Sequence, residues 1–229
     1  MHRNKAVSDG AISFYLDHYV RTRVAKVTYG AIVHEVYNPL DREHGRRAYT
    51  VYTDDTDGSL RIPGCFRAIL PKVGSHNLLR RWCMTPTCHV SQNTQVSETT
   101  EFKTMVFQTS DNATGFKTIS SEIICYRGQT KNPSWMDVDA GKSTYRHVIE
   151  FILSNSLMNM TLGNYSVAGT ISANISHLPK KPMMGTSGRT YYRMDFEISL
   201  LLGLTELQAQ LLWTENVRFF TSLQWTEIS

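Results

Sequence analysis

The chain alternates short apolar runs with turn-forming clusters, and only its beginning follows a different pattern. Between Lys5 and Val20, apolar residues recur at spacings of three and four, which predicts one short amphipathic helix. Farther on, runs rich in Val, Ile, Thr and Tyr predict strands that each bury one face. These runs span residues 23–38, 47–53, 59–70, 101–109, 117–128 and 190–213. The expected fold class is therefore mainly β, a two-layer β-sandwich with a short N-terminal helix.

Two turn signals predict hairpins. An Asp-rich turn from Asp54 to Gly58 separates the second and third runs, and "SDNATG" at 110–115 joins the fourth run to the fifth as a hairpin-like pair. In the last run every second residue is apolar, and these residues are expected to face the core. They are Tyr192, Met194, Phe196, Ile198, Leu207, Ala209, Leu211 and Trp213.

Charge and hydropathy exclude two classes of partner. The 24 Lys and Arg residues outnumber the 20 Asp and Glu residues, but the basic clusters lie in separate segments and are interleaved with acids. No continuous surface for nucleic acid is therefore expected. The longest apolar run, "ISLLLGL", is much shorter than the roughly 18 residues of a membrane-spanning helix. We expect neither nucleic-acid binding nor a membrane segment.

One stretch, "VGSHNLLRRWCMTPTCHVSQ" at 73–92, does not fit the β pattern. Its His76, Cys83, Cys88 and His89 are residue types that bind zinc, but structural zinc sites usually hold two cysteines at C-x2-C spacing, which is missing here. We therefore predict no metal site and interpret the stretch as an insertion foreign to the domain around it. Valine codons begin with GT and one glutamine codon ends in AG, so a translated intron is the favoured explanation.

Other reactive side chains have structural explanations. Cys65 and Cys125 lie in strand-like contexts and are expected to be buried thiols. His34 and Glu35 are adjacent in a strand, where neighbours point to opposite faces, so they should not form an acid-base pair. No phosphate loop or catalytic triad is found, and no cofactor is expected.

The beginning of the chain, "MHRNKAVSDGAISFYL", lacks the apolar region of a secretory signal. A cytoplasmic location follows as the expectation, with the cysteines as free thiols. The Asn-x-Ser/Thr sequons at Asn112, Asn159, Asn164 and Asn174 are then chance matches.

Several motifs, taken in order, resemble the 70-kDa heat-shock protein family. Without residues 73–92, the chain reads "LPK", "NTQVSETTEF", "MVFQTSDNATG" and "IICYRGQ", an order similar to that of the family's substrate-binding β-sandwich. "ISHLPKKPMMG" and "MDFEISLLLGLTELQAQL" resemble a connection and the paired strands of the same domain. "KAVSDGAISFYLD" resembles the last helix of the family's ATPase domain, and "RVAKVTYGAIVHEVYNPLDREHGRR" resembles the divergent twelve-like branch of animals and fungi.

The resemblance implies a role in protein binding. In the family, the sandwich holds extended peptides in an apolar slot, and the matching motifs assign Ala31, His34, Phe107 and Ser121 to that slot. Only Phe107 is both bulky and apolar, and the polar His34 and Ser121 would weaken the capture of apolar peptides. The resemblance further implies that residues 5–20 are a remnant ATPase helix, that 21–217 form the sandwich, and that 218–229 are an irregular tail.

Three functions stay open. The leading one is a truncated heat-shock-like chaperone that binds unfolded or extended peptides, without ATP, Mg²⁺ or catalysis of its own, because the family's phosphate loops have no counterpart. The alternatives are the C-terminal portion of a full-length chaperone ATPase whose gene was split, and a secreted carbohydrate-binding sandwich. A second insertion is predicted at about 147–168, because its deletion joins "DVDAGKSTYR" to "TISANISHLPKKP".

Overall fold

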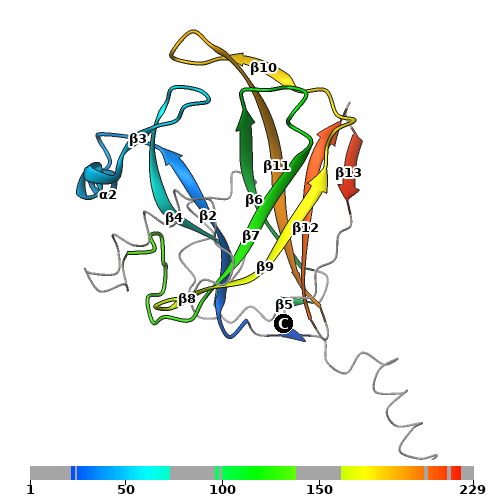
Figure 1. Ribbon diagram of the computed structural model, residues 1–229. Coiled ribbons are helices and arrows are strands. Elements are labelled where there is room, and N and C mark those ends of the chain that lie inside the picture. Colours follow the sequence, from blue (N-terminus) through cyan, green and yellow to red (C-terminus); the bar gives the residue numbers. More distant parts are fainter. Residues whose placement is uncertain are drawn as a thin grey trace, which may run out of the picture.

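The computed structural model describes residues 22–23, 25–72, 96–97, 100–137, 161–203, 206–215 and 218–222. These residues form antiparallel sheets that pack against each other, which confirms the predicted mainly β sandwich (Figure 1). The strands are β1 Thr22–Arg23, β2 Thr28–Val36, β3 Tyr52–Thr53, β4 Leu60–Leu70, β5 Val96–Ser97, β6 Glu101–Ser110, β7 Thr118–Tyr126, β8 Thr161–Leu162, β9 Tyr165–Asn174, β10 Lys181–Met184, β11 Thr190–Leu202, β12 Leu207–Glu215 and β13 Arg218–Ser222.

A short helical lobe lies between β2 and β3. It consists of α2, Arg42–Arg46, and a 3-10 turn, Ala48–Thr50. The helix begins at Asp41, whose carboxylate accepts hydrogen bonds from the backbone amides of Glu43 and His44 and thereby satisfies amides that lack a helical partner. The lobe extends away from the sandwich on the side of β3 and β4 (Figure 1).

One sheet is organised around β11, the longest strand. Along one edge, β11 pairs with β6 from Tyr192↔Ser110 to Leu201↔Glu101. Its other edge pairs first with β10 and then with β12, and β13 pairs with the far side of β12. Strand β6 therefore ends this sheet on one side, since no other described strand pairs with it.

The second sheet has the order β3-β4-β2-β7-β9-β8. Its β3–β4 hairpin confirms the turn predicted at Asp54 to Gly58. The outer edge of β4 beyond β3 is covered by a short segment: the Phe66 amide donates to Ser134 O at 2.9 Å and the Met136 amide donates to Gly64 O at 3.1 Å. A covered edge cannot template further pairing, so this side of the sheet is closed.

The main core lies between the two sheets. Its fully buried residues come from both layers, and they include Ile119 and Ile123 of β7 and Ile198 and Leu200 of β11. The alternation predicted for the last run is confirmed, because Phe196, Leu207, Ala209, Leu211 and Trp213 are also buried there and Tyr192 and Met194 pack against them.

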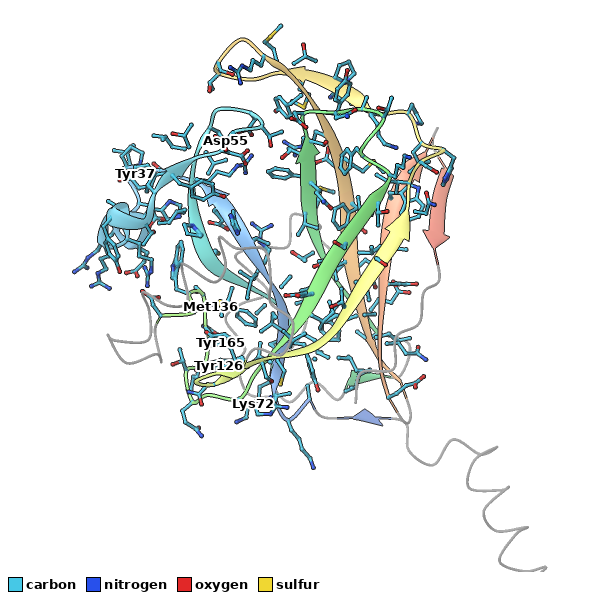
Figure 2. All side chains as sticks on the ribbon, viewed as in Figure 1. Tyr37, Asp55, Lys72, Tyr126, Met136 and Tyr165 are labelled. Atoms are coloured by element: carbon cyan, nitrogen blue, oxygen red, sulfur yellow. The ribbon has the colours of Figure 1, made fainter. Side chains whose placement is uncertain are left out.

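An aromatic cluster packs where β2, β4, β7 and β9 meet. It contains Phe66, Tyr126, Tyr165 and Met136, of which Tyr126, Tyr165 and Met136 lie close together in Figure 2. The rings of Tyr126 and Tyr165 have centroids 4.7 Å apart, a separation typical of favourable aromatic pairs. This cluster fixes the part of the sheet in which β2 and β7 are neighbours.

Three sequence expectations are corrected. Strands β6 and β7 do not form a paired hairpin: β6 joins β11, whereas β7 joins β2 and β9 in the other sheet. Alternation alone cannot tell a hairpin from a connection between layers, because both bury one face. The tail expected to be irregular contributes β13 over Arg218–Ser222.

The third correction concerns the second insertion. Residues 161–168, its C-terminal part, belong to the sheet, because Tyr165 pairs with Tyr126 and is buried among the aromatic residues. The helix expected at 5–20, the stretch at 73–92 and residues 147–160 lie outside the described residues. Within the part of the chain that the structure describes, no helix has the length and apolar character needed to cross a membrane.

Candidate functional site

The feature that best fits a binding site is a split in the six-stranded sheet. Strands β2 and β7 pair at only three positions, Thr28↔Tyr126, Tyr29↔Cys125 and Gly30↔Ile124. Both strands continue, β2 as far as Val36 and β7 back to Thr118, but the two diverge (Figure 1). We call this divergence the split. On its two sides, the facing edges of β2 and β7 pair with no other described strand.

The free edge of β6 lies opposite the split. Arg67 of β4 donates from Nη1 to the backbone oxygen of Met105 at 2.9 Å, which brings that edge close to one side of the split. On the other side, the Ser120 amide of β7 donates to Oε1 of Gln108 at 3.4 Å. Side chains thus take the place of strand pairing at the free edge of β6 and at the free edge of β7. These contacts satisfy backbone groups that a neighbouring strand would otherwise bind.

Three of the four residues assigned to the slot lie on the strands that border the split, Ala31 and His34 on β2 and Ser121 on β7. Ala31 is 1% exposed and belongs to the core cluster between the sheets. Ser121 is half-buried and lies between Ile119 and Ile123, the alternating core residues of β7. Both side chains are small, so they leave the neighbouring strand edges accessible at low steric cost.

Two of the slot residues, His34 and Phe107, are linked through Arg61. The guanidinium carbon of Arg61 lies 5.2 Å from the ring centroid of Phe107, and that of Arg193 lies 4.0 Å from it. Phe107 is 36% exposed, so its ring does not lie in a closed apolar pocket. The two guanidinium groups hold the ring by cation–π contacts instead. The four predicted residues therefore form two separate pairs and do not line one continuous apolar slot.

His34 and Tyr52 lie near the Arg61 guanidinium. Its Nδ1 is hydrogen-bonded to the Tyr52 hydroxyl. Burial lowers the pKa of His34, and the positive charge of Arg61 lowers it further, although Asp54 opposes the effect. Burial, together with Asp54, raises the pKa of Tyr52 to about 12. Both groups are therefore neutral at physiological pH, and Glu35 takes no part in this pair, as the strand alternation predicts.

Arg61 itself is 4% exposed and is compensated by two carboxylates. Its Nε lies 2.6 Å from Oδ2 of Asp54, and its Nη2 contacts Oδ2 of Asp57. Burial alone would raise the pKa of the Asp57 carboxyl, but hydrogen bonds from Ser59 and the charge of Arg61 outweigh it and lower that pKa. Charges buried in this way require close partners, and Arg61 has them.

The β3–β4 turn that carries these carboxylates contacts the β10–β11 turn of the other sheet. The Thr186 amide donates to the backbone oxygen of Asp57 at 2.9 Å. At Gly185, a Cβ atom would lie 2.6 Å from that same oxygen, so only glycine permits the approach. One end of the sandwich is therefore closed by polar contacts between turns.

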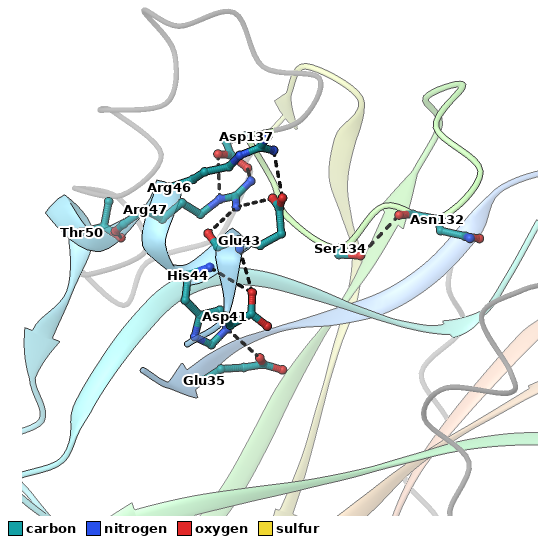
Figure 3. A network of polar contacts seen from close by, with 10 residues as sticks. All are labelled: Glu35, Asp41, Glu43, His44, Arg46, Arg47, Thr50, Asn132, Ser134 and Asp137. Carbon is teal, nitrogen blue, oxygen red and sulfur yellow. Dashed lines mark hydrogen bonds and ion pairs between the residues drawn. The ribbon is translucent and has the colours of Figure 1, made fainter. Parts of the chain in front are cut away.

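A second network of buried charge holds the helical lobe (Figure 3). Arg47 binds Asp137 with two hydrogen bonds of 2.8 and 2.9 Å, donates to Glu43, and lies 4.3 Å from the centroid of the Trp135 ring. His44 accepts the Asn38 amide at Nδ1, so its Nε2 carries the proton. These contacts attach the lobe to the segment that covers β4, which is a structural role.

Three further groups, one carboxyl and two thiols, have perturbed environments. Burial raises the pKa of the Glu122 carboxyl, and its Oε2 is a buried atom without a hydrogen-bond partner among the described residues. Cys65 and Cys125 are buried free thiols, as predicted, and burial raises the pKa of each. A thiol with a raised pKa is a poor nucleophile. In the described ranges, no three His, Cys, Asp or Glu side chains are grouped as metal ligands.

Sequence reasoning missed Arg61, Arg67 and Gln108. A signal existed for Arg61, since an arginine directly after an Asp-rich turn and inside an apolar strand needs a buried carboxylate. No comparable signal marks Arg67 or Gln108, whose partners are backbone groups of strands in other parts of the sequence.

Comparisons of the chain with protein-family models, with curated proteins and with solved structures find no match. The heat-shock resemblance accordingly rests on the sequence motifs alone.

Proposed function

We propose that the chain is a peptide-binding β-sandwich of the divergent heat-shock type, which acts in the cytoplasm without catalysis of its own. In this proposal, an extended segment of another protein enters the split and adds a strand to the free edge of β7. The observation that carries the proposal is the short β2–β7 ladder, which ends at Gly30↔Ile124 while both strands continue.

Strand addition suits this site better than capture by an apolar pocket. Of the four residues assigned to the slot, Ala31, His34 and Ser121 are small or polar, and the ring of Phe107 lies against two guanidinium groups, so side-chain pockets contribute little. Backbone groups along β7 from Thr118 to Ile123 pair with no strand of the described residues on the side away from β9. Main-chain hydrogen bonds supply the affinity in this mode of recognition, which explains why polar residues are tolerated at His34 and Ser121.

The experiment compares two substitutions at one position. The Ser120 amide points toward the free edge, since it donates to Gln108. Ser120→Pro removes this donor and spares the β9 side, whereas Ser120→Ala keeps it. The proposal predicts that full-length protein binds a subset of an array of random decapeptides, that Ser120→Ala binds the same subset, and that Ser120→Pro binds none while it remains folded by circular dichroism. Equal binding by both variants would overturn strand addition at β7.

A further inference from the structure

The side chains of Arg67 and Gln108 occupy the hydrogen-bonding groups that an added strand would use. Arg67 holds the backbone oxygen of Met105 on the free edge of β6, at 2.9 Å. Gln108 holds the Ser120 amide on the free edge of β7, at 3.4 Å. Each of these backbone groups belongs to a strand whose corresponding edge pairs with no described strand.

Arg67 is held in place from the opposite side. Its Nη2 donates to Oε1 of Glu35 at 2.9 Å, and the other oxygen of Glu35 lies 3.6 Å from Nε2 of His44. Arg67 pairs across the ladder with Ala31, a core residue, so its side chain leaves β4 on the interior side, toward β6. The Arg67 guanidinium is therefore positioned before any ligand arrives.

Gln108 is attached more weakly. Its bond to Ser120 is long for an N–H···O hydrogen bond and exposed to solvent, so water competes with it. The two contacts therefore differ. Arg67 is held by the carboxylate of Glu35, whereas the Gln108 side chain can rotate away from the Ser120 amide.

We propose that Arg67 and Gln108 are edge caps that cover backbone groups beside the split when no peptide is bound, an inference that rests on the peptide-binding function proposed above. An incoming strand displaces Gln108 from the Ser120 amide and Arg67 from Met105, and then forms its own main-chain bonds to the free edge of β7 and to the Met105 oxygen of β6. The caps also protect against self-association, because exposed strand edges pair with other copies of a chain whereas covered edges do not. Arg67 lowers peptide affinity by roughly fivefold, the effect of one ordinary hydrogen bond, and the weaker Gln108 contact lowers it by about twofold.

The first test needs no ligand. In the 229-residue Gln108→Ala variant, the exchange rate of the Ser120 amide, measured by nuclear magnetic resonance, should rise by about twofold, the effect of a weak hydrogen bond. Gln208→Ala is the matched control, because Gln208 lies on β12 and its side chain bonds only Glu206 among the described residues. An unchanged Ser120 rate in Gln108→Ala overturns the caps, whatever the protein binds.

The second test uses a fluorescent decapeptide of alternating valine and threonine with a lysine at each end. Arg67→Met should bind it about fivefold more tightly than wild type, whereas Arg127→Met, which removes an exposed arginine bonded to Ser166, should not. Equal affinity in Arg67→Met and wild type overturns the role of Arg67. If the Ser120 rate rises but neither this probe nor any array peptide binds any variant, the peptide-binding function is wrong and the caps stand as edge protection alone.

Discussion

The two sides of the split are attached to the rest of the molecule by different forces. On the β7–β9 side, Ile119, Ile123 and Ile171 belong to one apolar core with the β11–β12 hairpin. On the β2–β4 side, Ala31, Ile69 and Leu70 belong to the same core, but the diverging end contacts β6 through the guanidinium groups of Arg61 and Arg67. Apolar packing is dense and does not exchange partners, whereas hydrogen bonds at a partly exposed edge are easily exchanged for others. The β2–β4 side is therefore the side that can move.

The largest effect is expected on the apolar side. Ile123→Ala should lower the free energy of unfolding by about 2 to 5 kcal/mol, because the side chain is fully buried and its removal leaves a cavity. Urea denaturation measures the change. Thr118→Ala, at the exposed beginning of the same strand, is the control and should change stability by less than about 0.5 kcal/mol. A loss below about 1 kcal/mol for Ile123→Ala would contradict the distinction between the two sides.

A smaller loss is expected when the buried charge of the helical lobe is broken. Arg47→Met leaves Asp137 without its double hydrogen bond and should lower the free energy of unfolding by about 2 to 4 kcal/mol. Arg47→Met combined with Asp137→Leu should recover part of this loss, because the uncompensated carboxylate is gone. If the double variant is as unstable as the sum of the two single variants, the two residues do not interact as the structure indicates.

A pH-dependent contribution is expected from His34. Its pKa is lowered in the folded chain by burial and by Arg61, so protonation favours the unfolded chain. The contribution of His34 to stability is therefore complete above its ordinary pKa of 6.5 and decreases as the pH falls from 6.5 toward the lowered value. Denaturation at pH 5 and pH 8 should show this decrease in wild type but not in His34→Gln. The same pH dependence in both proteins would assign it to Asp57 or another group.

The smallest effect is a gain. Burial raises the pKa of Glu122, and its Oε2 has no partner among the described residues, so the charged form is disfavoured in the folded chain. Glu122→Gln should therefore raise the free energy of unfolding slightly at pH 7, with the gain vanishing as the pH falls below the ordinary Glu pKa of 4.5. Thermal denaturation at both pH values measures it. A loss of stability at pH 7 would show that the carboxylate has a partner.

The sequence predicts elements better than it predicts pairings. Alternation identified β11 and β12 and the residues they bury, because a strand with one buried face shows its pattern locally. The same pattern misplaced β6 beside β7, since the choice between sheets depends on contacts distant in sequence. Motif order places Ala31 and Ser121 beside the split. His34 and Phe107 lie instead on either side of Arg61, whose partners come from the β3–β4 turn and from β6 of the other sheet, and motif order does not reveal these contacts.

Hydrogen exchange along β7, measured by nuclear magnetic resonance with and without a bound decapeptide, tests strand addition most directly. Because the Ser120 amide points toward the free edge, the amides of Thr118 and Glu122 point the same way. Strand addition predicts that peptide slows exchange at these three alternate residues and leaves β12 unchanged. Slower exchange at β12 without any change at Thr118, Ser120 and Glu122 would place the peptide elsewhere and contradict binding at the split.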